Sequence, residues 1–192
     1  MAESLITKRA IADSLKLLTK EKSFEKISVK DISEKCGINR QTFYYHFVDK
    51  FALLEWIYQT ELLDTTLQDV SFDNWREKFT GTLEAMRADK RFYINTINHT
   101  EDYIQRFLVE QAGTFFIRAI DELDEKSKVR SDQRQFFSKF FAYGVCGTII
   151  EWAESGMQAE PSYIVDNMWK LLTYCERVAY MRVTEEGFID ER

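Results

Sequence analysis

The sequence predicts an all-α protein, with an N-terminal three-helix unit that holds a helix-turn-helix motif and a C-terminal helical bundle. A single Pro and seven Gly in 192 residues leave few points at which a helix must end. Apolar side chains recur at helical spacing along most of the chain. Residues that start and stop helices, such as Ser28 and Gly37, stand at the ends of these periodic stretches.

The first helix is expected from about Ser4 to Lys20. Ile11, Leu15 and Leu18 recur there at i, i+4 and i+7, which places them on one buried stripe. A loop around Ser23 then leads into the second helix.

The second helix is short and begins after Ser28. The Ser28 hydroxyl is suited to accept the backbone N–H of Asp31, whose carboxylate also matches the positive end of the helix. Val29, Ile32 and Cys36 follow at i, i+3 and i+7, so they predict a helix of about two turns with one buried face.

The third helix follows almost at once. Gly37 can adopt the left-handed conformation that ends a helix, and Asn39 is a second N-cap residue. At 100° per residue, Phe43 and Phe47 define the inward face of this helix. Two short helices joined by such a tight turn are typical of a DNA-reading unit.

The opposite face of the third helix carries groups that recognise DNA. A Gln amide pairs with adenine, an Arg with guanine, and a Thr methyl group contacts a thymine methyl group. An ordinary helical hairpin with a solvated outer face is the alternative, but such a face usually carries Glu and Lys, and this one has no acid. The outward and flanking residues are Arg40, Gln41, Thr42, Tyr44, Tyr45 and His46.

These residues resemble a known family. Thr42-Phe43-Tyr44, Tyr45-His46-Phe47, Asp49-Lys50 and Leu53-Leu54, with Ile27 to Ile32 upstream, are similar to the N-terminal domain of TetR-type bacterial transcription regulators. The resemblance implies base contacts by Arg40, Gln41, Thr42 and Tyr45, and phosphate contacts by Ser28, Tyr44, His46 and Lys50. Ser23 and Gln41 depart from the family pattern, and the second departure changes the expected DNA sequence preference.

The charge distribution agrees with a DNA-binding N-terminal part. Residues 1–50 hold ten Lys and Arg against seven Asp and Glu, whereas residues 51–192 hold sixteen against twenty-five. Lys30 flanks the start of the second helix, where backbone N–H groups also attract an anion, so it is a further candidate for phosphate binding. We therefore expect a DNA-binding domain over residues 1–50 and an effector-sensing and dimerisation domain over 51–192, with double-stranded DNA as a partner.

Composition argues against several other classes of protein. No apolar run approaches the length of a membrane span, and no signal segment is present, so a cytoplasmic location without a membrane partner is expected. The three Cys and two His lack ligand spacing, so neither a metal site nor a cofactor is predicted. Without a Gly-rich phosphate loop or a Ser elbow, the chain is not expected to be an enzyme.

The C-terminal part is predicted to continue in helices. Asp49 can cap a fourth helix that runs through Leu63. The further expected elements are a helix from Ser71 or Asp73 through Met86, a short helix near Phe92 to Ile97, a long helix opened by Thr100 and running through Ile120, a charged connection from Asp121 to Arg130, a helix capped by Ser131 and stopped by Gly156, and a last helix with Pro161 in its first turn.

The last two helices predict a homodimer. The apolar face of the helix after Ser131 is too wide for one neighbour, and small residues such as Gly144 permit close approach by another helix. Both helices packing only within their own chain is the alternative. The expected interface consists of Phe137, Phe141, Gly144, Val145, Thr148, Ile149, Trp152, Met168, Leu171, Leu172 and Cys175.

The sequence is compatible with more than one kind of signal. Eight aromatic residues suit either a core or a pocket for an apolar effector, namely Trp56, Trp75, Phe79, Phe92, Tyr93, Tyr103, Phe107 and Phe115. The run Arg40 to Tyr44 and the acidic, aromatic C-terminal half also resemble the TetR-like activators of dihydroxyacetone-kinase operons, which implies activation with a protein co-activator. The alternatives are a repressor released by a small molecule and a DNA-bound adaptor without a role in transcription.

Overall fold

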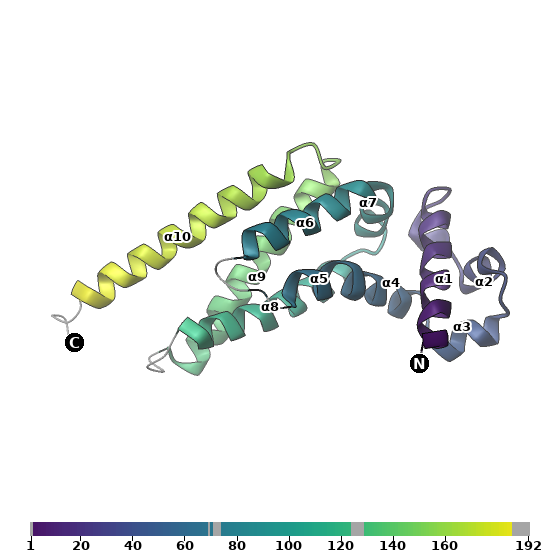
Figure 1. Cartoon of the computed structure of the whole chain (residues 1–192), viewed down its shortest axis with the longest axis horizontal. Helices are drawn as coiled ribbons and strands as arrows, with labels where there is room; N and C mark the ends of the chain where they lie inside the picture. The colour runs from purple at the N-terminus through teal and green to yellow at the C-terminus, as the bar shows by residue number, and fades with distance from the viewer. Residues whose placement is uncertain (1, 69, 71–73, 124–128, 186–192) are drawn as a thin grey trace.

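The computed structural model describes residues 2–68, 70, 74–123 and 129–185, and helices are the only regular secondary structure among them (Figure 1). The all-α prediction is confirmed. The elements are α1 (Ala2–Thr19), the 3-10 turn η1 (Phe24–Lys26), α2 (Val29–Cys36), α3 (Arg40–His46), α4 (Lys50–Tyr58), the π-helical segment η2 (Gln59–Leu63), α5 (Asp64–Leu67), α6 (Trp75–Ala88), α7 (Lys90–Asn98), α8 (Tyr103–Leu123), α9 (Ser131–Glu154) and α10 (Pro161–Glu185).

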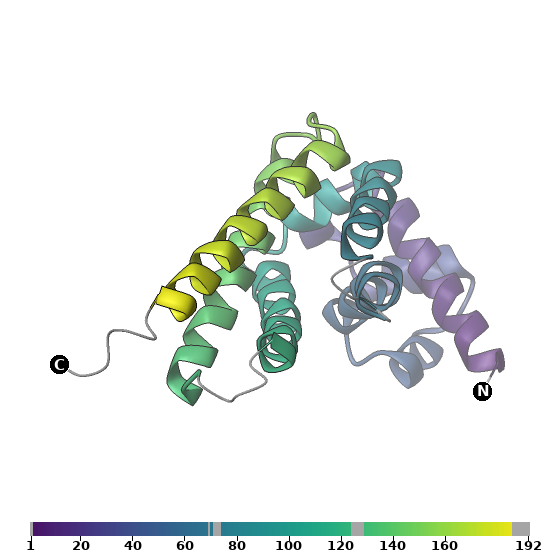
Figure 2. The ribbon, with the colours of Figure 1, turned by 60° about the vertical axis from the view of Figure 1, so that its left-hand side comes forward.

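The first three helices form a unit at one end of the molecule, at the right of Figure 1. From this unit α4 leads into the larger body, in which α8 and α9 pack side by side and α10 packs against α6 (Figures 1 and 2). Because α1 also contacts α7, the N-terminal unit touches the body at a second place besides α4.

The N-terminal unit is built around fully buried apolar side chains. Ile11 and Leu15 from α1 meet Ile32 from α2 and Phe43 from α3, and each of the four has a relative exposure of 0%. Phe24 fills the same core from η1. The apolar faces predicted from the sequence are therefore the faces that the three helices turn toward one another. This packing removes their apolar area from water.

Most predicted helix ends are confirmed. Asp49 Oδ1 accepts hydrogen bonds from the backbone N–H groups of Phe51 and Ala52, each at 2.8 Å, so it caps α4 as expected. Gly156 follows the end of α9 with a φ of 83°, and Pro161 is the first residue of α10. The expected start at Ser71 or Asp73 lies outside the described residues, and α6 is described from Trp75.

Two predicted caps are wrong. The Thr100 hydroxyl donates to the Thr96 carbonyl at 2.7 Å, at the end of the preceding helix, and α8 begins only at Tyr103. Ser131 is the first residue of α9, whose N-cap position is Arg130. Thr100 shows why a hydroxyl residue near a helix end does not always cap the next helix, because its side chain also bonds back to the carbonyl of the residue four positions earlier.

The fourth helix continues past Tyr58 as predicted, but with a change of hydrogen-bond pattern. Gln59–Leu63 form a π-helical turn between α4 and α5. The Thr60 hydroxyl donates to the Trp56 carbonyl at 2.7 Å beside this turn. Because a π turn widens a helix locally, this segment is a place where the connecting helix departs from a straight rod.

Candidate nucleic-acid interface

The third helix is held by its cap and by its buried side. Asn39 Oδ1 accepts the backbone N–H of Thr42 at 2.8 Å and the Thr42 hydroxyl at 3.1 Å. Phe43 and Phe47 on the inward side have exposures of 0% and 5%. With the cap at one end and two aromatic side chains behind it, α3 presents its other face in a fixed orientation.

The outward face of α3 consists of the residues predicted to contact bases. Tyr45 is 83% exposed, and Arg40 and Gln41 are exposed as well. Thr42 is half-buried, and its hydroxyl proton is donated to Asn39, which leaves its methyl group and oxygen lone pairs for other contacts. Base contacts by these four residues stay a prediction, and the structure brings them together on one short helix.

Two aromatic contacts order this face. The Arg40 guanidinium lies 5.8 Å from the centroid of the Tyr44 ring, and Arg40 Nη2 donates to the Tyr44 hydroxyl at 3.3 Å. The Tyr45 and His46 rings pack edge to face, with their centroids 5.0 Å apart. Side chains that already contact one another lose less freedom when they bind a ligand, so these contacts pre-organise the surface.

The start of α2 carries the next predicted anion-binding residues. Ser28 Oγ accepts the Asp31 backbone N–H at 3.2 Å, and the Ser28 backbone N–H donates to Asp31 Oδ2 at 2.8 Å. Hydrogen bonds from the Ser28 hydroxyl and backbone, with one from Lys22, lower the pKa of Asp31 to about 2. Asp31 is therefore a fixed anion at this helix end, beside the predicted phosphate contact of Ser28.

Lys30 and Lys50 differ in what they offer to a phosphate. Lys30 is exposed, and its ammonium lies 3.7 Å from Glu34 in a surface pair, which is a weak type of interaction. Lys50 Nζ donates to the carbonyl oxygens of Phe24, Glu25 and Ile27 at 2.9, 3.0 and 2.8 Å. These three bonds use every proton of the ammonium, so in this structure Lys50 has none left for a phosphate.

The burial of Lys50 has an electrostatic consequence. Desolvation lowers the pKa of Lys50, and the carboxylates of Glu25 and Asp31 act in the opposite direction. The sequence carried no signal for this arrangement, because the three acceptors are main-chain carbonyls, which every residue has. The phosphate contact predicted for Lys50 stays a prediction that this geometry does not favour.

The predicted dimer surface is partly apolar and open. Phe137 is 41% exposed and Leu171 is 61% exposed, and Gly144, Thr148 and Cys175 are exposed too. The other half-buried members of the predicted set are Phe141, Val145, Ile149, Met168 and Leu172. Their contact with a second subunit stays a prediction.

The structure contradicts the prediction that Trp152 belongs to the dimer surface. Its side chain is 4% exposed, and its indole N–H donates to the Ala159 carbonyl at 2.9 Å across the turn between α9 and α10. A side chain buried in its own chain offers no surface to a partner. The same two helices also expose aromatic residues outside the predicted set, namely Phe136, Phe140, Tyr143, Tyr163 and Tyr174, each at least 59% exposed.

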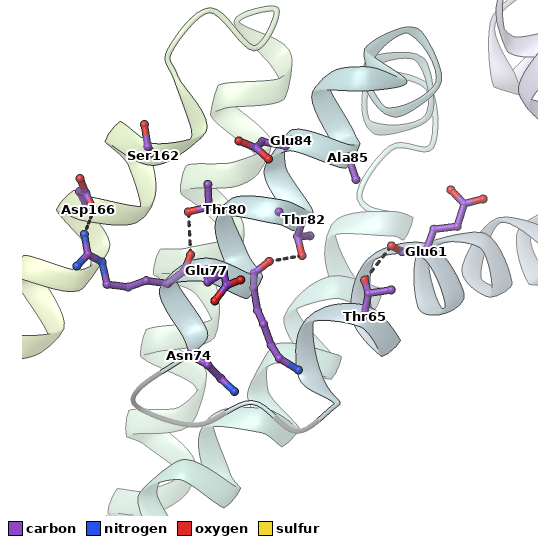
Figure 3. A pocket seen from close by; sticks show the side chains of 13 residues that line it. Glu61, Thr65, Asn74, Glu77, Thr80, Thr82, Glu84, Ala85, Ser162 and Asp166 are labelled. Atoms are coloured by element: carbon purple, nitrogen blue, oxygen red, sulfur yellow. Dashed lines mark hydrogen bonds and ion pairs between the residues drawn. The ribbon is translucent and has the colours of Figure 1, made fainter.

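Two open hollows in the described part of the helical body are lined by more polar than apolar residues. The larger, of about 960 Å³, lies between η2 and α5 on one side and α6 and the start of α10 on the other, where Arg76 pairs with Asp166 (Figure 3). The smaller, of about 450 Å³, lies between α5 and α8. Of the eight aromatic residues considered as pocket lining, Phe115 alone lines either hollow, whereas Phe92, Tyr93 and Trp75 are core residues.

The described residues contain no cluster of His, Cys, Asp and Glu that would hold a metal ion. Within the same ranges, no helix combines the length and the hydropathy that crossing a bilayer requires. Cys146 is buried, and burial raises the pKa of its thiol to about 12, so this thiol stays protonated.

Comparison with known proteins covers both parts of the chain. Residues 9–57 match the family model for bacterial regulatory proteins of the tetR family, and residues 73–174 match a model for the C-terminal region of transcriptional regulators within the same family. The curated HTH-type dhaKLM operon transcriptional activator DhaS of Lactococcus lactis subsp. lactis (strain IL1403) is 26% identical over 165 residues, which span 85% of this chain and 88% of that protein.

Solved structures agree on the fold. The dihydroxyacetone kinase operon activator DhaS superposes with a TM-score of 0.68 at 22% identity, over 91% of this chain and 98% of that chain. NalD, described as the secondary repressor of the MexAB-OprM multidrug efflux pump in Pseudomonas aeruginosa, superposes with a TM-score of 0.62 at 17% identity, over 90% and 96% of the two chains. With both family models matched and the reading helix in place, the chain belongs to the TetR family of DNA-binding bacterial transcription regulators.

Proposed function

We propose that the protein acts in the cytoplasm as a homodimer that reads a pseudo-palindromic operator with α3 of each subunit, and that it activates transcription together with a protein co-activator. The observation that carries the DNA-reading part is the exposure of Tyr45, 83%, on a helix whose opposite side is fixed by the buried Phe43. A large aromatic side chain on a rigid, acid-free helix face is suited to a DNA groove and costly to leave in water.

The proposed homodimer is supported by the surface of α9 and α10. Phe137 and Leu171 leave apolar area exposed on two long helices, and a second copy of the same pair would cover it as half of a four-helix bundle. Two reading helices, each in a major groove, require half-sites about one helical turn apart.

The co-activator part is supported by the openness of the two hollows described above. An apolar effector needs an enclosed apolar pocket. Here the aromatic residues Phe92 and Tyr93 fill the core instead, and both hollows are open and lined mainly by polar side chains. The relative in Lactococcus lactis is itself described as a transcriptional activator.

Selection from a library of random duplexes with the purified full-length chain tests the DNA-reading proposal. We expect an inverted repeat whose half-site centres lie about one helical turn apart. Enrichment of a single unpaired half-site would contradict the dimeric reading, and no enrichment would contradict sequence-specific binding.

A repressor released by a small molecule is the second candidate function, and NalD, a repressor, has the same fold. The two functions differ in a reporter assay with the selected operator. A repressor lowers expression in the absence of any partner, and a metabolite alone restores it. An activator with a co-activator raises expression only when both proteins are present. Release of the purified protein from DNA by a metabolite alone would exclude the co-activator proposal.

A DNA-bound adaptor without a role in transcription is the third candidate. It predicts many dispersed sites in a genome-wide map of bound DNA, whereas a local regulator predicts one or a few sites near its own gene. The same map therefore separates these two.

A further inference from the structure

The end of α1 at Thr19 and the connection that leads to α2, residues 20–28, are held to the helical body by a side chain of α7. Asn95 Nδ2 donates to the Thr19 carbonyl at 2.7 Å and to the Lys22 carbonyl at 2.9 Å. Asn95 Oδ1 accepts the backbone N–H of Phe24 at 2.8 Å. Both N–H donors and the oxygen of this carboxamide are thus used on one stretch of main chain more than 70 residues away in sequence.

The same stretch is held from its other side by Lys50 of α4. Phe24 is the residue that both side chains share, because its N–H donates to Asn95 and its carbonyl accepts from Lys50 at 2.9 Å. The Phe24 ring is fully buried and meets the Phe51 ring at 5.4 Å. The peptide groups at both ends of Phe24 are therefore fixed, one to each of two different helices.

The helix that carries Asn95 belongs firmly to the body. Phe92 and Tyr93 on α7 are buried, and the buried Thr96 hydroxyl bonds to the Tyr58 hydroxyl at 2.7 Å. In turn α7 packs against α9, one of the two helices of the proposed dimer surface. In Figures 1 and 2, α7 lies beside the end of α1 that leads into the connection. A physical path therefore runs from α9 through α7 and Asn95 to the N-terminal unit.

We propose that Asn95 is the positioning residue that sets the orientation of the DNA-reading unit relative to the body, and hence relative to the α3 helix of a second subunit. The inference rests on the dimeric operator binding proposed above. A planar carboxamide with three directed hydrogen bonds fixes both position and angle. Flexibility at this contact would leave each α3 able to read its half-site while losing the fixed placement of two such helices on one duplex.

A second polar contact nearby differs in character. Lys16 of α1 pairs with Asp89 at 3.2 Å and with Glu61, and its ammonium lies 5.2 Å from the centroid of the Phe92 ring. A point charge between two carboxylates and a ring keeps α1 close to the body but tolerates changes of angle. We therefore assign orientation to Asn95 and proximity to Lys16.

The test compares Asn95→Ala with Asn98→Ala, a matched control on the exposed surface of the same helix. Affinity is measured by fluorescence anisotropy for the selected two-half-site duplex, for a duplex with one half-site scrambled, and for duplexes with the spacer changed by one base pair. Asn95→Ala is expected to weaken binding to the intact duplex roughly tenfold, because a looser linkage lowers the effective concentration of the second reading helix. The affinity of Asn95→Ala for the duplex with one half-site should equal that of the wild type, and this variant should discriminate less between duplexes of different spacer length. Asn98→Ala should match the wild type on every duplex.

Amide hydrogen exchange supplies an independent readout. In Asn95→Ala the amides of residues 20–27 should exchange faster, whereas those of α7 should keep their protection, since Ala is a good helix former. Asn95→Asp is the second variant. It keeps an acceptor for the Phe24 N–H but places a carboxylate oxygen against the carbonyls of Thr19 and Lys22, so the loss on the intact duplex should be at least that of Asn95→Ala.

The inference would be overturned if Asn95→Ala lost the same affinity for the intact duplex and for the single-half-site duplex. It would also be overturned if Asn95→Ala bound both duplexes like the wild type although the amides of residues 20–27 exchanged faster. If the wild type itself bound the two duplexes equally, the proposed dimeric reading would fail instead, so the two failures are distinguishable. Should Asn95→Ala not fold, the same comparison is made with Asn95→Asp, whose shape is that of the native side chain.

Discussion

Individual side chains of α3 are expected to separate specific from non-specific binding. Gln41→Ala and Tyr45→Ala should each lose about 1–3 kcal/mol of affinity for the selected operator and little for random DNA, because base contacts carry the sequence information. Gln158→Ala, an exposed Gln in the turn between α9 and α10, is the control. Competition binding with operator and random duplexes measures both affinities. Unchanged operator affinity for Gln41→Ala would mean that the face assigned to DNA is wrong.

Two Lys residues of the same unit should behave differently. Lys50→Ala leaves three carbonyl groups without their partner, so the free energy of unfolding should fall by about 1–3 kcal/mol, with no change in the salt dependence of DNA binding. Lys30→Ala should leave unfolding unchanged and make the logarithmic salt slope shallower by about one unit, since each phosphate contact releases one counterion. Urea unfolding and salt titrations distinguish the two. A shallower slope for Lys50→Ala would restore its predicted phosphate contact.

Asp31 gives the N-terminal unit a defined pH dependence. Its pKa is lowered from 3.8 to about 2 in the folded state, first by the Ser28 hydroxyl. A depressed carboxyl pKa contributes stability that is complete above the unfolded value and lost as the pH falls through the folded value. The stability difference between wild type and Asp31→Ala should therefore be constant above pH 4 and shrink between pH 4 and pH 2. A difference that grew on acidification would contradict the Ser28–Asp31 cap.

At the scale of elements, the turn between α2 and α3 depends on one backbone conformation. Gly37 has a φ of 72°, and a Cβ there would meet nothing within 4 Å, so backbone strain alone opposes a substitution. Gly37→Ala should lower the free energy of unfolding by about 1 kcal/mol. Gly81→Ala, at an exposed helical position of α6 with equally open space, should raise it by about 0.5–1 kcal/mol. Thermal unfolding of both variants measures these changes in the free energy of unfolding, which should have opposite signs. Changes of the same sign would contradict the role given to Gly37 in this turn.

The sequence predicted the elements around α3 better than those farther along the chain. Ser28, Asn39 and Asp49 are caps whose side chains bond within three residues of themselves, so local chemistry decides them. Thr100 has the same chemistry but lies at the end of α7, and its hydroxyl bonds backward to Thr96. The π turn at Gln59–Leu63 left no mark in the apolar spacing, because it adds one residue to a turn of a helix that is buried on several sides.

At the scale of the whole molecule, the exposed apolar face of α9 and α10 should control assembly. Leu171→Asp places a charge on this face and should give a monomer in sedimentation analysis, with operator binding reduced to that of a single half-site. Leu17→Asp, which alters an equally apolar residue 46% exposed on α1, is the matched control and should leave the oligomeric state unchanged. A wild-type protein that is monomeric at micromolar concentration would refute the dimer itself.

By itself the sequence determined the fold class, the helix-turn-helix and the face of α3, because capping, glycine conformation and helical periodicity act over a few neighbouring residues. The tertiary structure decided the roles of Lys50, Trp152 and Asn95. Lys50 and Asn95 bond to main-chain groups of a distant connection, and Trp152 is covered by a turn that follows it. Those partners are brought together only when α4, α7 and α9 pack. The carbonyl and N–H groups involved are main-chain groups that nearly every residue has, so the spacing of side chains along the sequence does not predict these hydrogen bonds.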